Sequence, residues 1–252
     1  VGGFTTADVA VNESYNGSAW TELGDINDAR RVYGTAGTST AGLIFGGSTP
    51  AASAVTETWN GASWTEVGDL NTVRDENSGC GTNTAALCTG GCTNPGFVAK
   101  ADNESWNGAS WTEVGDLNTA RRTTGQQAGT STASLVFGGG DSPKLAVTEL
   151  WNGASWTEVA DLNTARFYAG ATHGSSTSAL MAGGVDTTAA TEKWNGSAWT
   201  ETSDLNTERG YLAGTGATNA GALVFAGYTS TNFNATEEWS DPAYETKSIT
   251  AS

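Results

Sequence analysis

The chain has 252 residues, enough for a single all-β domain with a buried core. Its 27 acidic residues outnumber 11 Lys and Arg, and a formal net charge of −16 leaves no basic face for phosphates, so we expect no nucleic-acid partner. No run approaches the roughly 18 apolar residues that cross a bilayer, and we expect no membrane insertion. Abundant Gly (34), scarce Pro (4) and prominent Trp (10) predict short strands and tight turns.

One sequence segment recurs along the whole chain. The stretch from Glu57 to Arg74 returns almost unchanged at 104–121, 149–166 and 192–209, more loosely at 13–30, and truncated at 237–240. The first aromatic residue of the copies falls at Tyr15, Trp59, Trp106, Trp151, Trp194 and Trp239, with spacings of 44, 47, 45, 43 and 45 residues. A steady period of this length is typical of a β-propeller.

Each repeat is predicted to contain four short strands, as the copy at 121–165 illustrates. A Gly-rich strand is expected over 124–130, an apolar strand over 133–137, an alternating strand over 146–151 and a fourth over 155–159. Asn152-Gly153 between the last two predicts a hairpin, because both residues accept positive φ.

In chain order, residues 1–29 are predicted to form the outer strand pair of an incomplete blade. Complete blades are expected at 30–73, 74–120, 121–165, 166–208 and 209–252, the last with a fourth strand at 246–250. Val1-Gly2-Gly3 matches the end of a second strand. We therefore expect either a six-bladed ring, the favoured arrangement, whose first inner strand pair lies upstream of Val1, or five blades with an additional amino-terminal hairpin.

These features resemble the kelch repeat. The resemblance covers the whole chain and consists of four strands per repeat, a Gly-Gly pair after the second strand, and spaced aromatics across the third and fourth strands. It implies one β-propeller domain over residues 1–252. The chain departs from the kelch pattern where Trp usually replaces the first Tyr and where Ala226 replaces one glycine.

Residues present in every repeat are interpreted as scaffold. We expect the tryptophan pairs to pack the blades, although partly exposed members would be able to stack on sugars. These tryptophans are Trp59, Trp64, Trp106, Trp111, Trp151, Trp156, Trp194 and Trp199. The repeated arginines are Arg74, Arg121, Arg166 and Arg209, with Arg30 in the looser copy, and we expect them to bind carboxylates or turn carbonyls and so lock blade to blade.

Metal and cofactor chemistry is not predicted. Each repeat supplies one aspartate, such as Asp69 or Asp116, but these should be spread around the ring, whereas calcium needs six or more converging oxygens. Cys80 and Cys88 flank one predicted turn and would be able to face each other, yet equivalent positions carry small or apolar residues, so we interpret both as core. The one histidine, His173, lies outside any recognisable nucleophile motif, and we expect no enzymatic activity.

Binding is instead predicted for the variable loops between the second and third strands. These loops are 48–54, 93–103, 141–146, 185–190 and 228–234, and a rigid repeat scaffold would present them on one side of the ring. The candidate binding residues within or beside these loops are Phe97, Lys100, Lys144, Tyr228 and Phe233.

The near-identity of the repeats, the richness in Ser, Thr, Asn and Gly, the acidity and the ending 247–252 resemble kelch-repeat proteins of marine tailed bacteriophages. This resemblance implies a virion or extracellular structural protein, such as a head decoration or tail-fibre tip, that contacts other virion proteins or a host-surface glycan. A bacterial extracellular adhesion or carbohydrate-binding propeller is the alternative, and an intracellular adaptor is a third. A homo-oligomer is left open.

Overall fold

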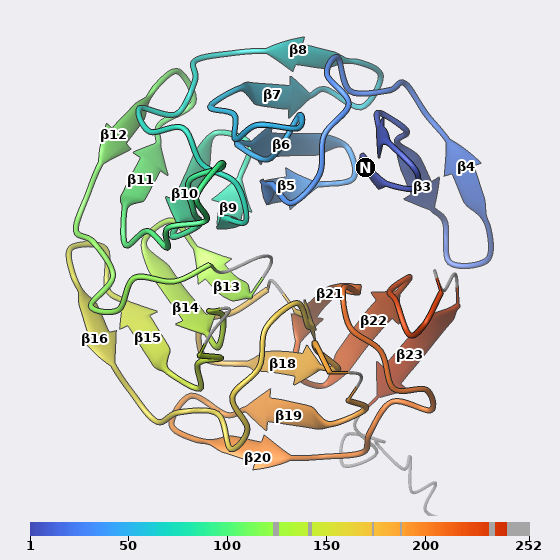
Figure 1. Ribbon diagram of the computed structural model, residues 1–252, viewed down its shortest axis with the longest axis vertical. Helices are drawn as coiled ribbons and strands as arrows, with labels where there is room; N and C mark the ends of the chain where they lie inside the picture. Colours follow the sequence, from blue (N-terminus) through green and yellow to red (C-terminus); the bar gives the residue numbers. More distant parts are fainter. Residues whose placement is uncertain (123–125, 141–142, 173, 187, 232–234, 241–252) are drawn as a thin grey trace, which may run out of the picture.

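The computed structural model describes residues 1–122, 126–140, 143–172, 174–186, 188–231 and 235–240. Within these residues the regular secondary structure consists of β-strands alone. The strands form small antiparallel sheets that follow one another around a central axis (Figure 1). The prediction of an all-β propeller is confirmed.

The described residues contain four four-stranded blades, numbered in chain order, with a fifth blade of which three strands are described. Blade 1 is β5 (Gly34–Thr38), β6 (Ala41–Phe45), β7 (Thr56–Trp59) and β8 (Trp64–Glu66), and blade 2 is β9 (Ser78–Thr82), β10 (Ala85–Thr89), β11 (Asn103–Trp106) and β12 (Trp111–Glu113). Blade 3 is β13 (Gln127–Thr130), β14 (Ala133–Phe137), β15 (Thr148–Trp151) and β16 (Trp156–Glu158), and blade 4 is β17 (Gly170–Ala171), β18 (Ala179–Ala182), β19 (Thr191–Trp194) and β20 (Trp199–Glu201). Blade 5 is β21 (Ala213–Thr218), β22 (Gly221–Phe225) and β23 (Thr236–Ser240). The fourth strand predicted at 246–250 lies outside the described residues.

Two strand pairs come before blade 1. The hairpin β1 (Gly3–Phe4) and β2 (Asp8–Val9) precedes the pair β3 (Glu13–Tyr15) and β4 (Trp20–Glu22), which we call the half-blade.

The Asn-Gly turns form the outer hairpins of blades 1 to 4 and of the half-blade as predicted. In blade 1 the side-chain oxygen of Asn60 accepts hydrogen bonds from the backbone amides of Ala62 and Ser63, each at 2.9 Å. Such a local bond replaces a backbone turn, while Gly61 supplies a φ of 93°. The turn places Trp59 directly opposite Trp64, and their ring centroids lie 5.3 Å apart.

The core of the molecule lies between blades. Successive side chains of a strand point to opposite faces of the sheet, so Phe45 of blade 1 packs against blade 2, whereas Ile44 faces the half-blade. The ring of Phe45 meets Trp111 of blade 2 with centroids 4.8 Å apart, and Phe137 of blade 3 meets Trp199 of blade 4 at the same distance. Every blade is therefore stabilised by its neighbours.

The half-blade occupies its own sector between blade 5 and blade 1 (Figure 1). Its Trp20 packs on Phe225 of blade 5 with ring centroids 5.5 Å apart, which repeats the contact that Phe45 makes with Trp111. The pair thus takes the place of the outer strands of a sixth blade. The described ring therefore has five blades and a partial additional blade, and the inner strand pair expected upstream of Val1 stays a prediction.

A candidate binding face on the loop side of the propeller

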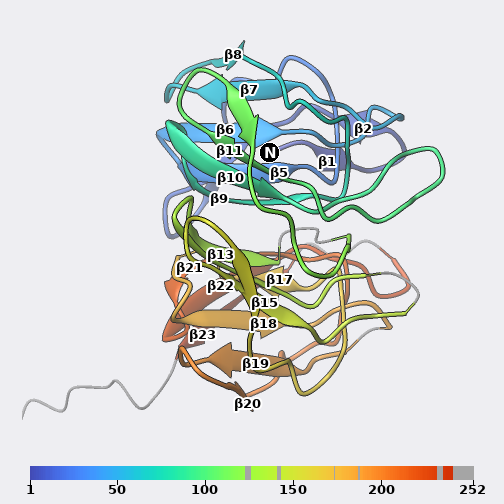
Figure 2. The same ribbon diagram turned by 90° about the vertical axis from the view of Figure 1, so that its left-hand side faces the viewer.

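Viewed from its edge, the propeller carries the loops between second and third strands on one side, at the right of Figure 2. We call this side the loop face. The linkers that lead into each first strand also end there, because consecutive strands alternate in direction. The variable residues and the repeated arginines therefore belong to the same side of the ring.

Each repeated arginine forms an ion pair below the loop face, and both side chains are buried in every pair except Arg209–Glu237, where Glu237 is 16% exposed. Arg121 binds Glu149, a residue of the third strand of its own blade, and also donates to the carbonyl of Val147 at 2.6 Å. The other pairs are Arg30–Glu57, Arg74–Glu104, Arg166–Glu192 and Arg209–Glu237. Burial lowers the pKa of the Arg121 guanidinium, while the nearby Glu149 carboxylate raises it.

The same glutamate also binds the linker that arrives from the preceding blade. Glu149 accepts hydrogen bonds from the backbone and side-chain amides of Asn118, both at 2.8 Å, and from the backbone amide of Thr119 at 3.2 Å. The linker between two blades is thereby fastened to the third strand of the second. The repeated glutamate was not singled out from the sequence, although it begins every copy of the motif.

The repeated tryptophans are buried in the blades and cannot stack on sugars. The eight tryptophans of the four repeated pairs are between 1% and 8% exposed. Six of the eight indole nitrogens donate hydrogen bonds within the protein, as when Trp111 donates to the Thr56 hydroxyl at 3.0 Å and Trp199 donates to Thr148 at the same distance. Those of Trp64 and Trp156 are buried without a hydrogen-bond partner. The sugar-stacking alternative is therefore wrong for these residues.

The repeated aspartates cap strands. Asp69 accepts a hydrogen bond from the Thr56 amide at 3.2 Å, and Asp161 accepts one from the Thr148 amide at 3.1 Å. Within the described part of the chain, no three Asp, Glu, His or Cys side chains come together as metal ligands would.

Cys80 and Cys88 do not face each other. In the antiparallel register Cys80 lies opposite Leu87, and Cys88 lies opposite Gly79, so the two thiols project from opposite faces of blade 2. Cys80 packs toward blade 3 and Cys88 toward blade 1. Both are free, as is Cys92, whose thiol donates to the Asp75 carboxylate at 3.0 Å.

The predicted loop residues differ in their exposure and in their contacts. Phe97 is half-exposed and lies over the Arg122 guanidinium, 5.3 Å from the ring centroid, and Tyr228 is 44% exposed. The amine of Lys100 lies 3.4 Å from the Asp102 carboxylate, and Lys144 pairs with Asp186 of the next blade. Phe233 and His173 lie outside the described residues.

A buried polar network joins three blades beside Phe97. Glu76 and Arg122 form a two-point ion pair, with one of its contacts at 2.8 Å, and the same Arg122 nitrogen that makes this contact lies 3.1 Å from the Tyr168 hydroxyl. These residues precede the first strands of blades 2, 3 and 4. Although burial lowers the pKa of Arg122, hydrogen bonds to Glu76 and Tyr168 raise it above its ordinary value. Burial and the Glu76 carboxylate raise the pKa of Tyr168.

A row of tyrosines continues from this network to the surface. Tyr168 is buried and stacks on Tyr211, with ring centroids 4.4 Å apart, and Tyr211 meets Tyr228 edge to face at 6.4 Å. Tyr211 is 57% exposed. Tyr168 and Tyr211 both adopt positive φ just after the repeated arginine, as do Val32 and Glu76 in their blades. Sequence reasoning missed Tyr211, since its neighbourhood depends on contacts between blades.

Comparison with known proteins adds no relative. No protein-family model matches the chain, and a search of curated proteins found no match. The fold is therefore established by the structure, and the kelch resemblance rests on the sequence pattern alone. In the described residues no helix is long and apolar enough to cross a membrane.

The loop face can offer a ligand flat aromatic surface that is held in place. Tyr211 stacks on Tyr168, which is hydrogen-bonded to Arg122 of the Glu76–Arg122 pair, and Tyr228 packs edge to face on Tyr211. Rings fixed in this way lose little conformational freedom when a ligand binds.

Proposed function

We propose that this chain is a non-enzymatic binding protein, in which the propeller holds the loop face for contact with a glycan. The exposed tyrosines of that face carry the proposal. The C–H groups of a sugar ring pack against the electron-rich face of an aromatic ring, and Tyr211 and Tyr228 offer two such rings at right angles. Phe97 lies over the guanidinium of the same network.

We further propose that the protein is a kelch-like structural component of a phage virion, with a host-surface glycan as its ligand. The repeat style, the acidity and the phage resemblance support this location. The rival is a bacterial extracellular adhesion protein that uses the same face.

Glycan binding is tested with polysaccharide isolated from the surface of the presumed host, using calorimetry on the purified chain. Tyr211→Ala and Phe97→Ala should each weaken binding by about tenfold or more, since an exposed aromatic stack contributes on the order of 1.4 kcal/mol. Their melting temperatures should change little because both rings are half-exposed.

Phe4→Ala is the matched control, because Phe4 is also exposed and also lies over an arginine, Arg31, with a centroid distance of 4.6 Å. Its guanidinium partner is Arg31 and not Arg122 of the tyrosine network, so Phe4→Ala should leave affinity unchanged. Equal weakening by all three variants, or no binding by the unmodified chain, would contradict the glycan site.

The location is tested separately by density-gradient centrifugation of material from the source culture. Peptides of this chain should band with nuclease-protected DNA if the protein belongs to a virion. Their absence from that band would transfer the proposal to the bacterial adhesion protein.

A further inference from the structure

The sector that contains the half-blade has outer strands but no described inner strands, and a hollow of about 690 Å³ takes in this sector and the centre of the ring, where Cys80 of blade 2 and Ala171 of blade 4 also line it. We call the part of the hollow beside the half-blade the open slot. Around it lie Tyr15 and Trp20 of the half-blade, Thr35 and Ile44 of blade 1, and Thr215 and Leu223 of blade 5. In blades 1 to 4 the corresponding volume is filled by the first and second strands of the blade.

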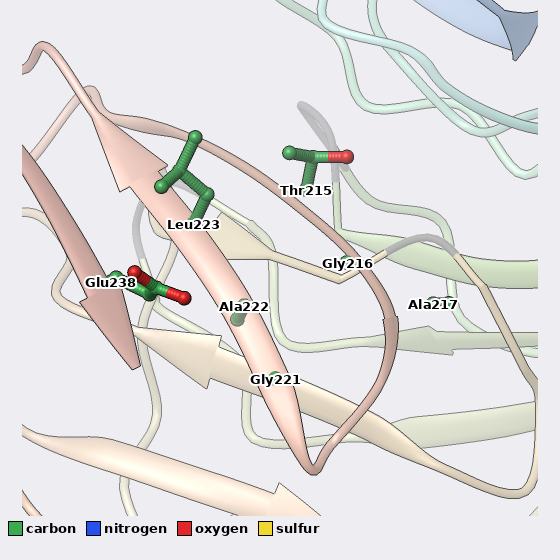
Figure 3. Close-up of a pocket in the computed structure, with 7 residues that line it drawn as sticks. All are labelled: Thr215, Gly216, Ala217, Gly221, Ala222, Leu223 and Glu238. Carbon is green, nitrogen blue, oxygen red and sulfur yellow. The ribbon is translucent and has the colours of Figure 1, made fainter. Parts of the chain in front are cut away.

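Side chains that are buried elsewhere in the ring are exposed around the open slot. Tyr15 and Trp20 are 38% and 42% exposed, whereas the aromatic pairs of blades 1 to 4 are at most 8% exposed. On blade 5, Leu223 is only partly buried, while its equivalent Leu135 in blade 3 is fully buried. Thr215, Leu223 and Glu238 lie opposite one another in neighbouring strands, on the face that Figure 3 shows in close-up.

The first residues of the chain already hold the position that follows a second strand. The amide of Gly2 donates to the Val11 carbonyl at 2.7 Å, and the equivalent bond in blade 1 runs from Gly46 to Val55. The amide of Gly3 donates to the Arg30 carbonyl at 2.9 Å, and its equivalent in blade 1 runs from Gly47 to Arg74. Val1 therefore stands where Phe45 ends the second strand of blade 1. A strand that leads into Val1 would run along the free edge of β3, opposite Glu13, Ser14 and Tyr15.

Glu13 provides an independent sign of what is missing. It is the copy of the glutamate that the other repeats pair with their own arginine, yet its side chain is exposed and pairs with no arginine among the described residues; the positive charge that acts on it is the Val1 ammonium, whose pKa Glu13 raises against the larger lowering by burial. In blade 1 the partner arginine, Arg30, precedes the first strand. The half-blade has no first strand among the described residues, and so no arginine arrives at Glu13.

We propose that the open slot is a docking site for a β-hairpin that is joined to the amino end of Val1 and that supplies both inner strands and the arginine partner of Glu13. Its second strand adds to β3 by backbone hydrogen bonds, as in β-strand addition to a free sheet edge. Its first strand packs small residues toward the channel, as β5 does in blade 1. Completion buries Tyr15, Trp20 and Leu223.

The test extends the chain with a hairpin of known pattern. A copy of residues 27–44, which runs from the blade 1 linker through the second strand, is placed directly before Val1, and a scrambled copy of the same composition serves as control. We expect the melting temperature to rise by about 5 °C or more, since each kcal/mol shifts it by roughly 2–4 °C at this size. Acrylamide quenching assigned to Trp20, by comparison with Trp20→Phe, should fall at least about twofold.

The arginine pairing gives a second, independent readout. Glu13→Gln should lower the melting temperature of the extended chain but leave that of the 252-residue chain unchanged, whereas Glu57→Gln should lower both. A free peptide of the same sequence should protect Trp20 only at far higher concentration, because covalent attachment raises its effective concentration to the millimolar range.

Three outcomes would overturn the proposal. One is an extended chain in which Trp20 stays as exposed as in the scrambled control. Another is protection by the free peptide but not by the extension, which would place the hairpin on a separate molecule. The third is a 252-residue chain that is a stable dimer with Trp20 already protected, which would make a second copy the occupant.

Discussion

Removing the repeated glutamate from one blade should destabilise the whole propeller. Glu149 accepts one hydrogen bond from Arg121 and three from the incoming linker, and both charged side chains are fully buried. Glu149→Ala leaves the guanidinium buried without a counter-charge. Breaking a buried pair in this way typically costs about 3–5 kcal/mol, so the melting temperature should fall by on the order of 10 °C.

Blade 5 contains a matched control. Glu237 makes the equivalent contacts to Arg209 and Asn206, but its side chain is 16% exposed. Arg209 itself is buried, but removal of the partly exposed Glu237 side chain opens its guanidinium to water, so Glu237→Ala should cost clearly less, about 1–2 kcal/mol. The double variant Arg121→Met/Glu149→Leu should recover part of the loss from Glu149→Ala, because it removes the unpaired charge.

The assay is equilibrium unfolding in urea, followed by tryptophan fluorescence and by circular dichroism. The midpoint should shift while the slope stays unchanged, which marks a change of stability and not of the surface exposed on unfolding. Equal losses for Glu149→Ala and Glu237→Ala, or a loss below about 1 kcal/mol for Glu149→Ala, would refute the argument that burial of the pair sets its contribution.

Three further predictions concern the core and the turns. Burial raises the pKa of the Cys80 thiol to about 12 and that of Cys88 to about 11. Unfolded thiols ionise near pH 8.5, so the unfolded chain loses these protons at a lower pH than the folded chain does. The free energy of unfolding should therefore fall as the pH rises from about 9 to about 11. Unfolding at pH 8 and pH 10.5 checks this, and Cys80→Ala/Cys88→Val, which copies blade 3, should reduce the pH dependence. Trp151→Ala should cost about 3–5 kcal/mol in the same urea assay, and a loss under about 1 kcal/mol would contradict its burial. Asn152→Ala removes two hydrogen bonds at 2.9 and 3.0 Å from an exposed turn and should cost only about 1 kcal/mol.

The class of fold could be predicted from the sequence alone, because the same short-range signals for strands and turns recur in every repeat. Alternating strands, Asn-Gly turns and Gly-Gly corners are short-range signals, and a period near 45 residues multiplies them around the ring. The blade-packing role of Trp151 followed from the same regularity, and the burial of that side chain in the structure is consistent with it.

The contacts that distinguish one sector from another were decided by the tertiary structure. Glu76 and Arg122 are separated by 46 residues, as are Arg122 and Tyr168, and no local sequence pattern shows that their side chains meet. The opposite directions of Cys80 and Cys88 depend on strand register, which a turn prediction leaves undetermined. The open slot likewise appears only when closure of the ring brings blade 5 beside the half-blade and blade 1, which are far from it in the sequence.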